Sequence, residues 1–326
     1  MRAAWYDEQG PAAEVLRLGE MPDPLPGPGE VRVRVTTSGI HIGDVGKRRG
    51  YWGSTMAYPR VIPHGDGTGV IDAVGERVDS RRIGERVWVY LAQSYRPFGT
   101  AAAYTVVPES RAVPLRSEIS DDQAAGLGIP GMTGHRAIFA DGPVTGKRIL
   151  VTGALGAVGR AAVAVARRGG ATVIATVRRA DQIPAALEAG AHHAVATSDG
   201  DVAKRILDAT GNQPIDRVAE LAFDTNLALD EEVLAYNGVL ATYATGDSSP
   251  RVPFWPLAFK NITVRFLSND DFPEDANVAA ARGLTDALVA GDLRYPIAAR
   301  LPLSEIVRAH ELVENPGTTG RVLLDL

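Results

Sequence analysis

The sequence predicts an α/β protein in which a parallel, doubly wound sheet is flanked by segments rich in short strands. The first observation is the stretch 148–179, where an apolar strand, a glycine turn, a helix and a second strand follow one another within about 30 residues. The second is a change of pattern, from closely spaced short strands over 1–119 to helices alternating with apolar strands over 120–268. The third is a hydrophobic share of 45% in 326 residues, which can fill a complete core.

The N-terminal region carries the signals of a partly open β-barrel. In the segment 30–40, Val31, Val33 and Val35 alternate with polar residues and fall on one face of a strand. The Pro/Gly-rich segment 22–30 is expected to be a connecting loop. Strands are expected at 2–6, 14–21, 30–40, 68–75, 84–91 and 102–109. Short strands with turn signals between them are typical of a barrel.

The middle of the chain alternates helices with buried strands, which predicts a parallel, doubly wound sheet. Helices are expected at 121–139, 157–168, 183–189 and 201–210, and strands at 148–151, 171–177, 191–196, 215–222 and 238–246. The C-terminal tail is expected to carry helices at 277–291 and 303–315 and a last strand at 320–326.

The turn after the strand 148–151 has the spacing Ala154-x-Gly156-x-x-Gly159. Gly156 would let the backbone approach a pyrophosphate, and Gly159 would let the following helix pack against the strand. The helix N-terminus supplies amide donors and a positive dipole end. The residues expected to contact a dinucleotide here are Ala154, Leu155, Gly156, Ala157, Val158 and Gly159. The alternative is a turn with a structural role alone.

Composition excludes several classes of function. A net charge of −5 is not the excess of positive charge expected of a protein that binds nucleic acid or an anionic membrane. The absence of cysteine excludes disulfides, thiolate zinc sites and cysteine nucleophiles, and is typical of a cytoplasmic protein. No apolar run reaches the roughly 18 residues of a membrane span, and the first residues lack a signal-peptide core. We therefore expect a cytoplasmic protein with a small-molecule substrate.

Motifs along the whole chain resemble the medium-chain dehydrogenase/reductase superfamily, in its zinc-independent quinone oxidoreductase (zeta-crystallin-like) family. They are "PGPGEVRVRV", "SGIHIGDVGKRRGYW", "VIPHGDGTGVIDAVG", "GERVWV", "AAGLGIPGMTGHRAI", "ILVTGALGAVGRAAVAVA" and "AHELVENPGTTGRVLL". The resemblance implies a GroES-like barrel domain at 1–120 and 269–326. It also implies a Rossmann domain inserted at 121–268, an active site in the cleft between the domains, and a homodimer.

The zinc ligands of metal-using relatives are not matched in this chain. His41 stands where such relatives have Cys, and Gly65 stands at their His position. His41, His64 and Asp66 remain as an improvised ligand set, but no metal is expected. Without Lewis-acid help, the implied reaction is hydride transfer to a quinone or an α,β-unsaturated carbonyl.

Hydrogen-bond donors toward such an acceptor are expected in the loop segment "HIGDVGKRRGYW", residues 41–52. Relatives usually have Asn in place of His41 and Tyr in place of Gly46, so His41 or Tyr51 is expected to compensate. Asp44 matches the family position and is expected to hold the loop by a hydrogen bond. Thr133 matches a family Thr near the nicotinamide. The candidate catalytic residues are His41, Tyr51 and Thr133.

The end of the second strand predicts which nicotinamide nucleotide is used. About 20 residues after the glycine turn, an NAD-binding unit places an acidic residue on the ribose. This chain has Thr176, Arg178 and Arg179 there, and two guanidiniums are suited to a 2′-phosphate. We therefore expect NADPH. By resemblance, further cofactor contacts come from Phe223, Thr242, Tyr243, Ala244, Leu267 and Ser268.

The sequence thus predicts an NADPH-dependent, zinc-independent reductase of quinones or α,β-unsaturated carbonyls. One alternative is an enoyl-thioester reductase of the same superfamily. Another is a non-catalytic NADPH-binding or sensing protein, which the absence of the family Tyr at Gly46 keeps open.

Overall fold

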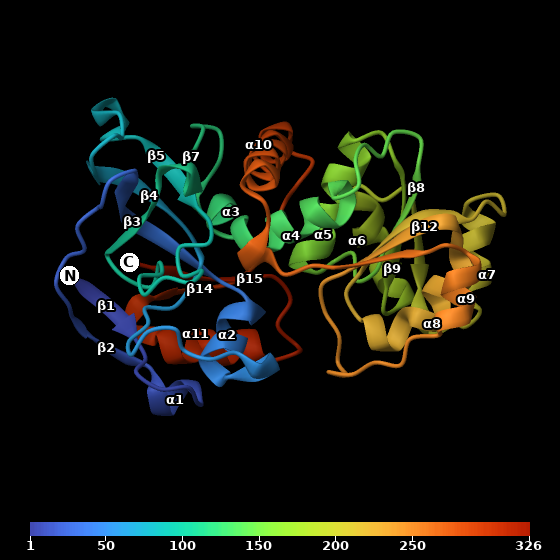
Figure 1. Ribbon diagram of the computed structural model, residues 1–326, viewed down its shortest axis with the longest axis horizontal. Coiled ribbons are helices and arrows are strands. Elements are labelled where there is room, and N and C mark those ends of the chain that lie inside the picture. The colour runs from blue at the N-terminus through green and yellow to red at the C-terminus, as the bar shows by residue number, and fades with distance from the viewer. The chain divides into compact units, whose positions relative to one another are not determined.

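A computed structural model describes residues 1–326 of the chain (Figure 1). Its backbone divides into two compact units. The first unit is formed by Met1–Pro130 together with Tyr295–Leu326, and the second by Gly131–Arg294. No helix is both long enough and apolar enough to cross a membrane.

These compact units are not divided where the sequence placed its domain boundaries. Residues 269–294, which the sequence assigned to the first domain, include α10 (Glu274–Ala290). This helix packs against α5 (Ala157–Arg168) inside the second unit. The functional boundaries at 120 and 268 stay a prediction.

The first unit is built around a seven-stranded sheet. The strand order is β14-β15-β3-β4-β5-β7, and β6 pairs with β3. The bounds are β3 (Glu30–Ile40), β4 (Asp66–Val74), β5 (Arg86–Val89), β6 (Tyr104–Pro108), β7 (Ala112–Pro114), β14 (Ile297–Pro302) and β15 (Arg321–Asp325). The side chains of Val31 and Val33 are buried at the centre of this sheet, as period-two alternation predicts. The β-rich, GroES-like architecture is confirmed.

Two segments of the first unit differ from the sequence expectation. The strand expected at 14–21 is β2 (Arg17–Glu20), paired with β1 (Arg2–Trp5), because α1 (Ala12–Val15) precedes it and buries Val15 in the core. The segment 41–52, expected as a loop, forms α2 (Ile42–Arg49). Side-chain capping at its first turn offsets the weak helix propensity of its two internal glycines.

The second unit contains a six-stranded, all-parallel sheet. Counted along the chain, its strand order is 3-2-1-4-5-6, the doubly wound order of a dinucleotide-binding fold. The strands are β8 (Arg148–Val151), β9 (Thr172–Val177), β10 (His193–Ala196), β11 (Ile215–Glu220), β12 (Leu234–Thr242) and β13 (Thr263–Phe266). The order reverses between β8 and β11, which pair directly. Ligands of such sheets bind at the carboxyl ends of the strands on both sides of this reversal.

Helices cover this sheet and connect its strands. α7 (Val202–Ala209) and α8 (Phe223–Val233) pack together beside it (Figure 1). The other helices of the chain are α3 (Asp121–Ala125), α4 (Gly128–Phe139), α6 (Ile183–Glu188), α9 (Phe254–Phe259) and α11 (Ile306–Glu314). The single helix expected at 121–139 is two helices, since Gly126 ends the first. Besides α1 and α2, the elements not expected from the sequence are α8, α9, β7, β13 and β14.

Candidate functional site

The turn after β8 is packed so closely that two of its glycines have no room for a side chain. Gly153 has a φ of 58°, and a Cβ there would overlap the side chain of Leu221. A Cβ at Gly159 would overlap the carbonyl oxygen of Gly153 and lie 2.7 Å from the Cα of Ala154. Because these are backbone atoms, they cannot move aside. Glycine at 159 therefore lets α5 approach the turn, as the spacing predicts.

The same turn leaves the N-terminus of α5 open to a ligand. No side chain caps this helix, whose N-cap residue is Gly156. A Cβ at Gly156 would meet one atom, the carbonyl oxygen of Gly153, at 3.3 Å. The amide of Ala154 donates to the carbonyl of Thr176 (3.1 Å), and that of Gly153 donates to Thr176 Oγ1 (3.3 Å), which ties the turn to β9. Free first-turn amides and an open approach fit a pyrophosphate.

The two arginines after β9 have different environments. Arg179 forms a bidentate ion pair with Asp181, with Nε–Oδ1 at 3.0 Å and Nη2–Oδ2 at 3.1 Å. Arg178 is exposed, its backbone amide donates to Gln182 Oε1 (3.1 Å), and its guanidinium makes no hydrogen bond or ion pair. Of the two guanidiniums, the one on Arg178 is therefore free to bind a phosphate.

The residues expected at the later strands all lie near the carboxyl edge of the sheet, with different exposure. Phe223 is buried, with its ring packed 5.6 Å from that of Phe266, so its side chain belongs to the core. Thr242 is also buried, Tyr243 and Leu267 are half-buried, and Ala244 and Ser268 are exposed. Thr133 is a buried residue of α4. Contact of these residues with a cofactor stays a prediction.

In the first unit, His41 and Asp44 cap α2 reciprocally. The amide of Gly43 donates to His41 Nδ1 (3.0 Å), and the amide of His41 donates to Asp44 Oδ2 (3.0 Å). The expected role of Asp44 in holding this segment is thus confirmed. Because Nδ1 of His41 accepts, a neutral ring carries its proton on Nε2, 3.3 Å from Asp44 Oδ2. Burial lowers the pKa of His41 well below its ordinary value and raises the pKa of Asp44 to about 7.

Two further histidines face each other in the core of the first unit. Nε2 of His64 lies 2.9 Å from Nε2 of His310, and the Nε–H of Arg48 donates to His310 Nδ1 (3.3 Å). Since Arg48 can only donate, His310 Nδ1 accepts and its Nε2 carries the proton. That proton is donated to His64 Nε2. Burial lowers the pKa of His310 well below its ordinary value and that of His64 to about 3, so both rings are neutral.

The other face of His64 continues the chain of hydrogen bonds. With its proton on Nδ1, His64 donates to Ser38 Oγ (2.9 Å). Ser38 lies 2.7 Å from Thr100 Oγ1, and Thr100 donates to the carbonyl of Asp66 (2.6 Å). Both ring nitrogens of His64 are therefore engaged within the protein. The improvised ligand set of His41, His64 and Asp66 is not assembled, and no group of three His, Cys, Asp or Glu side chains is placed to hold a metal ion.

After α2, the indole of Trp52, which lies in the segment expected to carry donors, packs against the helix at Gly46. A Cβ at Gly46 would overlap the indole of Trp52, so the Trp52 ring fills the space beside Gly46. Trp52 has a φ of 58°, a left-handed conformation that bulky residues rarely adopt. Tyr51 is half exposed, and its hydroxyl makes no hydrogen bond.

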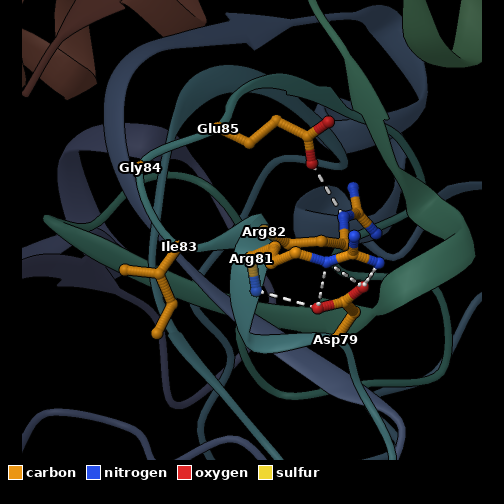
Figure 2. A pocket seen from close by; sticks show the side chains of 6 residues that line it. All are labelled: Asp79, Arg81, Arg82, Ile83, Gly84 and Glu85. Carbon is orange, nitrogen blue, oxygen red and sulfur yellow. Dashed lines mark hydrogen bonds and ion pairs between the residues drawn. The ribbon is translucent and has the colours of Figure 1, made fainter.

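A surface pocket elsewhere in the first unit carries none of the expected site residues. Figure 2 shows it lined by Asp79, Arg81, Arg82, Ile83, Gly84 and Glu85. Arg81 pairs with Asp79, and Arg82 pairs with Glu85 at 2.7 Å. Its charges are therefore neutralised within the pocket.

A glycine turn at the reversal of a parallel sheet, in a chain with a separate β-rich unit, is the arrangement of a two-unit protein that binds a dinucleotide. Two family models match: "Alcohol dehydrogenase GroES-like domain" over 27–117 and "Zinc-binding dehydrogenase" over 157–281. The chain belongs to the medium-chain dehydrogenase/reductase superfamily, in its quinone oxidoreductase-like branch. It is an oxidoreductase with a nicotinamide cofactor and a small-molecule substrate. The family expected from the motifs is confirmed.

Relatives and solved structures match the chain along nearly its whole length. A human quinone oxidoreductase is 27% identical over 99% of this chain and 97% of its own length. A 2-haloacrylate reductase from a Burkholderia species is 28% identical over 92% of this chain and 91% of its own. An NAD-dependent alcohol dehydrogenase structure is 25% identical, with a TM-score of 0.87 and complete coverage of both chains. A mycobacterial protein solved with NADPH is 24% identical, with a TM-score of 0.85 and complete coverage of both chains.

Proposed function

We propose that this protein is an NADPH-dependent, zinc-independent reductase that transfers hydride to a quinone or an α,β-unsaturated carbonyl. The observation that carries the choice of NADPH is Arg178, an exposed guanidinium without a partner at the end of β9. The acidic residue that would repel a 2′-phosphate is absent from this strand end. The nearest carboxylate in sequence, Asp181, is already paired with Arg179.

The chain's own groups bind and orient the reactants. The turn 154–159 holds the pyrophosphate through backbone amides, and Arg178 pairs with the 2′-phosphate. The bound nucleotide supplies the hydride. On the acceptor side, the free hydroxyl of Tyr51 donates a hydrogen bond to the oxygen on which charge develops. His41 serves as the cap of α2. We assign the nicotinamide end to Thr133, Thr242, Tyr243, Ala244, Leu267 and Ser268.

Support for the acceptor class comes from the relatives' names. One is a quinone oxidoreductase and another a 2-haloacrylate reductase, and both names denote acceptors with an electron-poor conjugated double bond. Such acceptors take hydride without the help of a Lewis acid. This agrees with His64, whose two ring nitrogens are both hydrogen-bonded within the protein. The enoyl-thioester and non-catalytic alternatives are outcomes of the test.

The test is nucleotide oxidation followed at saturating acceptor, with NADPH and NADH in parallel. The acceptors are 1,4-benzoquinone, 9,10-phenanthrenequinone, a series of 2-alkenals and crotonyl thioester. We expect turnover with the quinones or alkenals, a preference for NADPH, and rates unchanged by a strong zinc chelator. Turnover on the thioester alone would favour the enoyl-thioester alternative. Tight NADPH binding without turnover on any acceptor would favour the non-catalytic one.

We also propose that the protein is a homodimer that pairs through β13. This strand is the edge of the parallel sheet and has an open side. Next to it, α9 presents Phe254, Trp255 and Phe259, each more than 60% exposed, with ring centroids 5.2 and 5.6 Å apart along the row. Phe266, on β13, is 71% exposed. An apolar row beside an open strand edge fits a second copy of the same surface.

Light scattering coupled to gel filtration tests this proposal. We expect a dimeric mass for the wild type and a monomeric mass for Phe259→Glu, because the new charge would be buried at the interface. A monomeric wild type would overturn it.

A further inference from the structure

The carboxyl edge of β11 holds a buried acid pair with too few hydrogen-bond donors. Glu220 ends β11, Asp230 lies on α8, and neither side chain is exposed to solvent. Oε1 of Glu220 accepts from the amide of Ala222 and from Nδ2 of Asn226 (2.9 Å). Oε2 of Glu220 and both carboxyl oxygens of Asp230 have no partner. Three buried acceptor atoms without a donor need a physical explanation.

The position of the two acids on α8 and β11 indicates where the missing donor is. Asn226 and Asp230 are four residues apart, so they lie on the same face of α8, the face that bonds Glu220. Burial and the charge of Glu220 raise the pKa of Asp230. Burial and the same charge also raise the pKa of Tyr243, the other titratable group beside Glu220, which follows β12. No cation is placed against the pair. On α7, which also packs on α8, Lys204 pairs with Asp208 and Arg205 with Asp199.

We propose that Asp230 is a carboxylic acid whose proton is donated to Glu220 Oε2, and that this hydrogen bond positions the nucleotide-binding edge of the sheet. The proton belongs on Asp230, because Glu220 already receives two donors as a carboxylate and Asp230 receives none. Burial, and after it the charge of Glu220, raises the pKa of Asp230 to about 9.

The acid pair is connected to the glycine turn by direct contacts. Glu220 Oε1 holds the amide of Ala222, and the intervening Leu221 donates its amide to Thr152 Oγ1 (3.0 Å). The Leu221 side chain occupies the space that the missing Cβ of Gly153 leaves open. Ionisation of Asp230 would place two like charges together and remove the bond that fixes Glu220. We therefore infer that Asp230 is a positioning residue for the phosphate-binding turn.

The main test is NADPH affinity, measured by nucleotide fluorescence, as a function of pH in wild type and Asp230→Asn. The link to NADPH rests on the proposed function, whereas the proton on Asp230 does not. If ionisation of Asp230 displaces the phosphate-binding turn, the Kd of the wild type for NADPH should rise about tenfold between pH 7.5 and 10. Asn keeps a donor toward Glu220 and does not ionise, so Asp230→Asn should match the wild type at pH 7.5 and show no such rise. An equal rise in both proteins would overturn the proposal.

Infrared spectroscopy tests the proton without any nucleotide. The difference spectrum of wild type minus Asp230→Asn should show a carboxylic-acid carbonyl band at pH 7.5 that disappears by pH 10, because the buried carboxyls of Asp44 and Asp66 contribute equally to both proteins. Its absence from the difference spectrum at pH 7.5 would overturn the protonated Asp230. If the band is present and neither protein binds NADPH at any pH, the proposed cofactor is wrong, and the pH-dependent link to NADPH falls with it. Far-ultraviolet circular dichroism checks that both proteins stay folded at pH 10.

Discussion

The nucleotide edge of the second unit and the histidine cluster of the first are built in opposite ways. The nucleotide edge consists of backbone: glycines where a Cβ would overlap a neighbour, and helix amides without a cap. The histidine cluster consists of side chains from distant segments, since His64 and His310 are 246 residues apart. Local spacing fixes the first kind of site, whereas tertiary contacts fix the second. Substitutions in the two places should therefore fail in different ways.

The largest expected effect is that of Gly159→Ala on the nucleotide edge. The new Cβ would overlap the Gly153 carbonyl and press on the backbone of Ala154, so α5 must move away from the turn. We expect a loss of about 3 kcal/mol in the free energy of unfolding, measured in urea. NADPH binding should also weaken by more than about 100-fold, because the amides of the turn are displaced.

Gly156→Ala is the matched control in the same turn. Its Cβ would meet one atom at 3.3 Å, so the stability should change by less than about 1 kcal/mol while NADPH binding still weakens. Equal losses of stability in the two variants would contradict a turn in which only Gly159 is required for packing.

The next largest effect is that of His310→Ala, which breaks the histidine cluster. The substitution removes the donor to His64 Nε2 and the acceptor of Arg48 Nε, so about 2–3 kcal/mol of stability should be lost at pH 7.5. Because the folded-state pKa is lowered, each buried histidine adds stability that is present above its unfolded value near 6.5 and is lost as the pH falls. Between pH 7.5 and 5.5 this loss is about 1.4 kcal/mol for each histidine.

Urea unfolding at the two pH values measures this difference. The wild type should lose about 1.4 kcal/mol more than His310→Ala on acidification, since the buried carboxyls contribute equally to both proteins. His64→Gly is the companion variant. It should cost less at pH 7.5, because glycine relieves the left-handed φ of 77° at this position. Parallel pH profiles for wild type and His310→Ala would show that the imidazoles are not held neutral.

The same contrast explains what could be predicted from the sequence. The spacing of Gly156 and Gly159 and the alternation of helices and strands predicted the parallel sheet and its phosphate-binding turn, because both depend on local pattern. The pairing of His64 with His310 depends on contacts between separate segments. α8 was missed because its inward face carries Asn226 and Asp230 beside apolar residues. No periodic pattern marks such a helix.

A smaller effect, on cofactor choice, comes from the two arginines after β9. Arg178→Ala should raise the KM for NADPH by more than about tenfold and leave that for NADH little changed, because it removes a bidentate phosphate ligand. Arg179→Ala should cost less than half of the free energy of NADPH binding that Arg178→Ala costs, since Arg179 is paired with Asp181. Steady-state kinetics with both nucleotides measures the ratio. Equal effects of Arg178→Ala on NADPH and NADH would remove the basis for NADPH.

The smallest expected effect distinguishes the two candidate donors on the acceptor side. Tyr51→Phe removes a free hydroxyl and should lower kcat by about three- to tenfold with little change in the KM for the acceptor, because the hydrogen bond strengthens as charge develops. His41→Asn should change kcat by less than about threefold, because Asn can also accept from the Gly43 amide and keep the cap of α2. The result would be reversed if the His41 Nε2 proton, rather than the Tyr51 hydroxyl, met the acceptor. The side chain whose removal lowers kcat at constant KM thus identifies the residue that took over the role of the missing family Tyr.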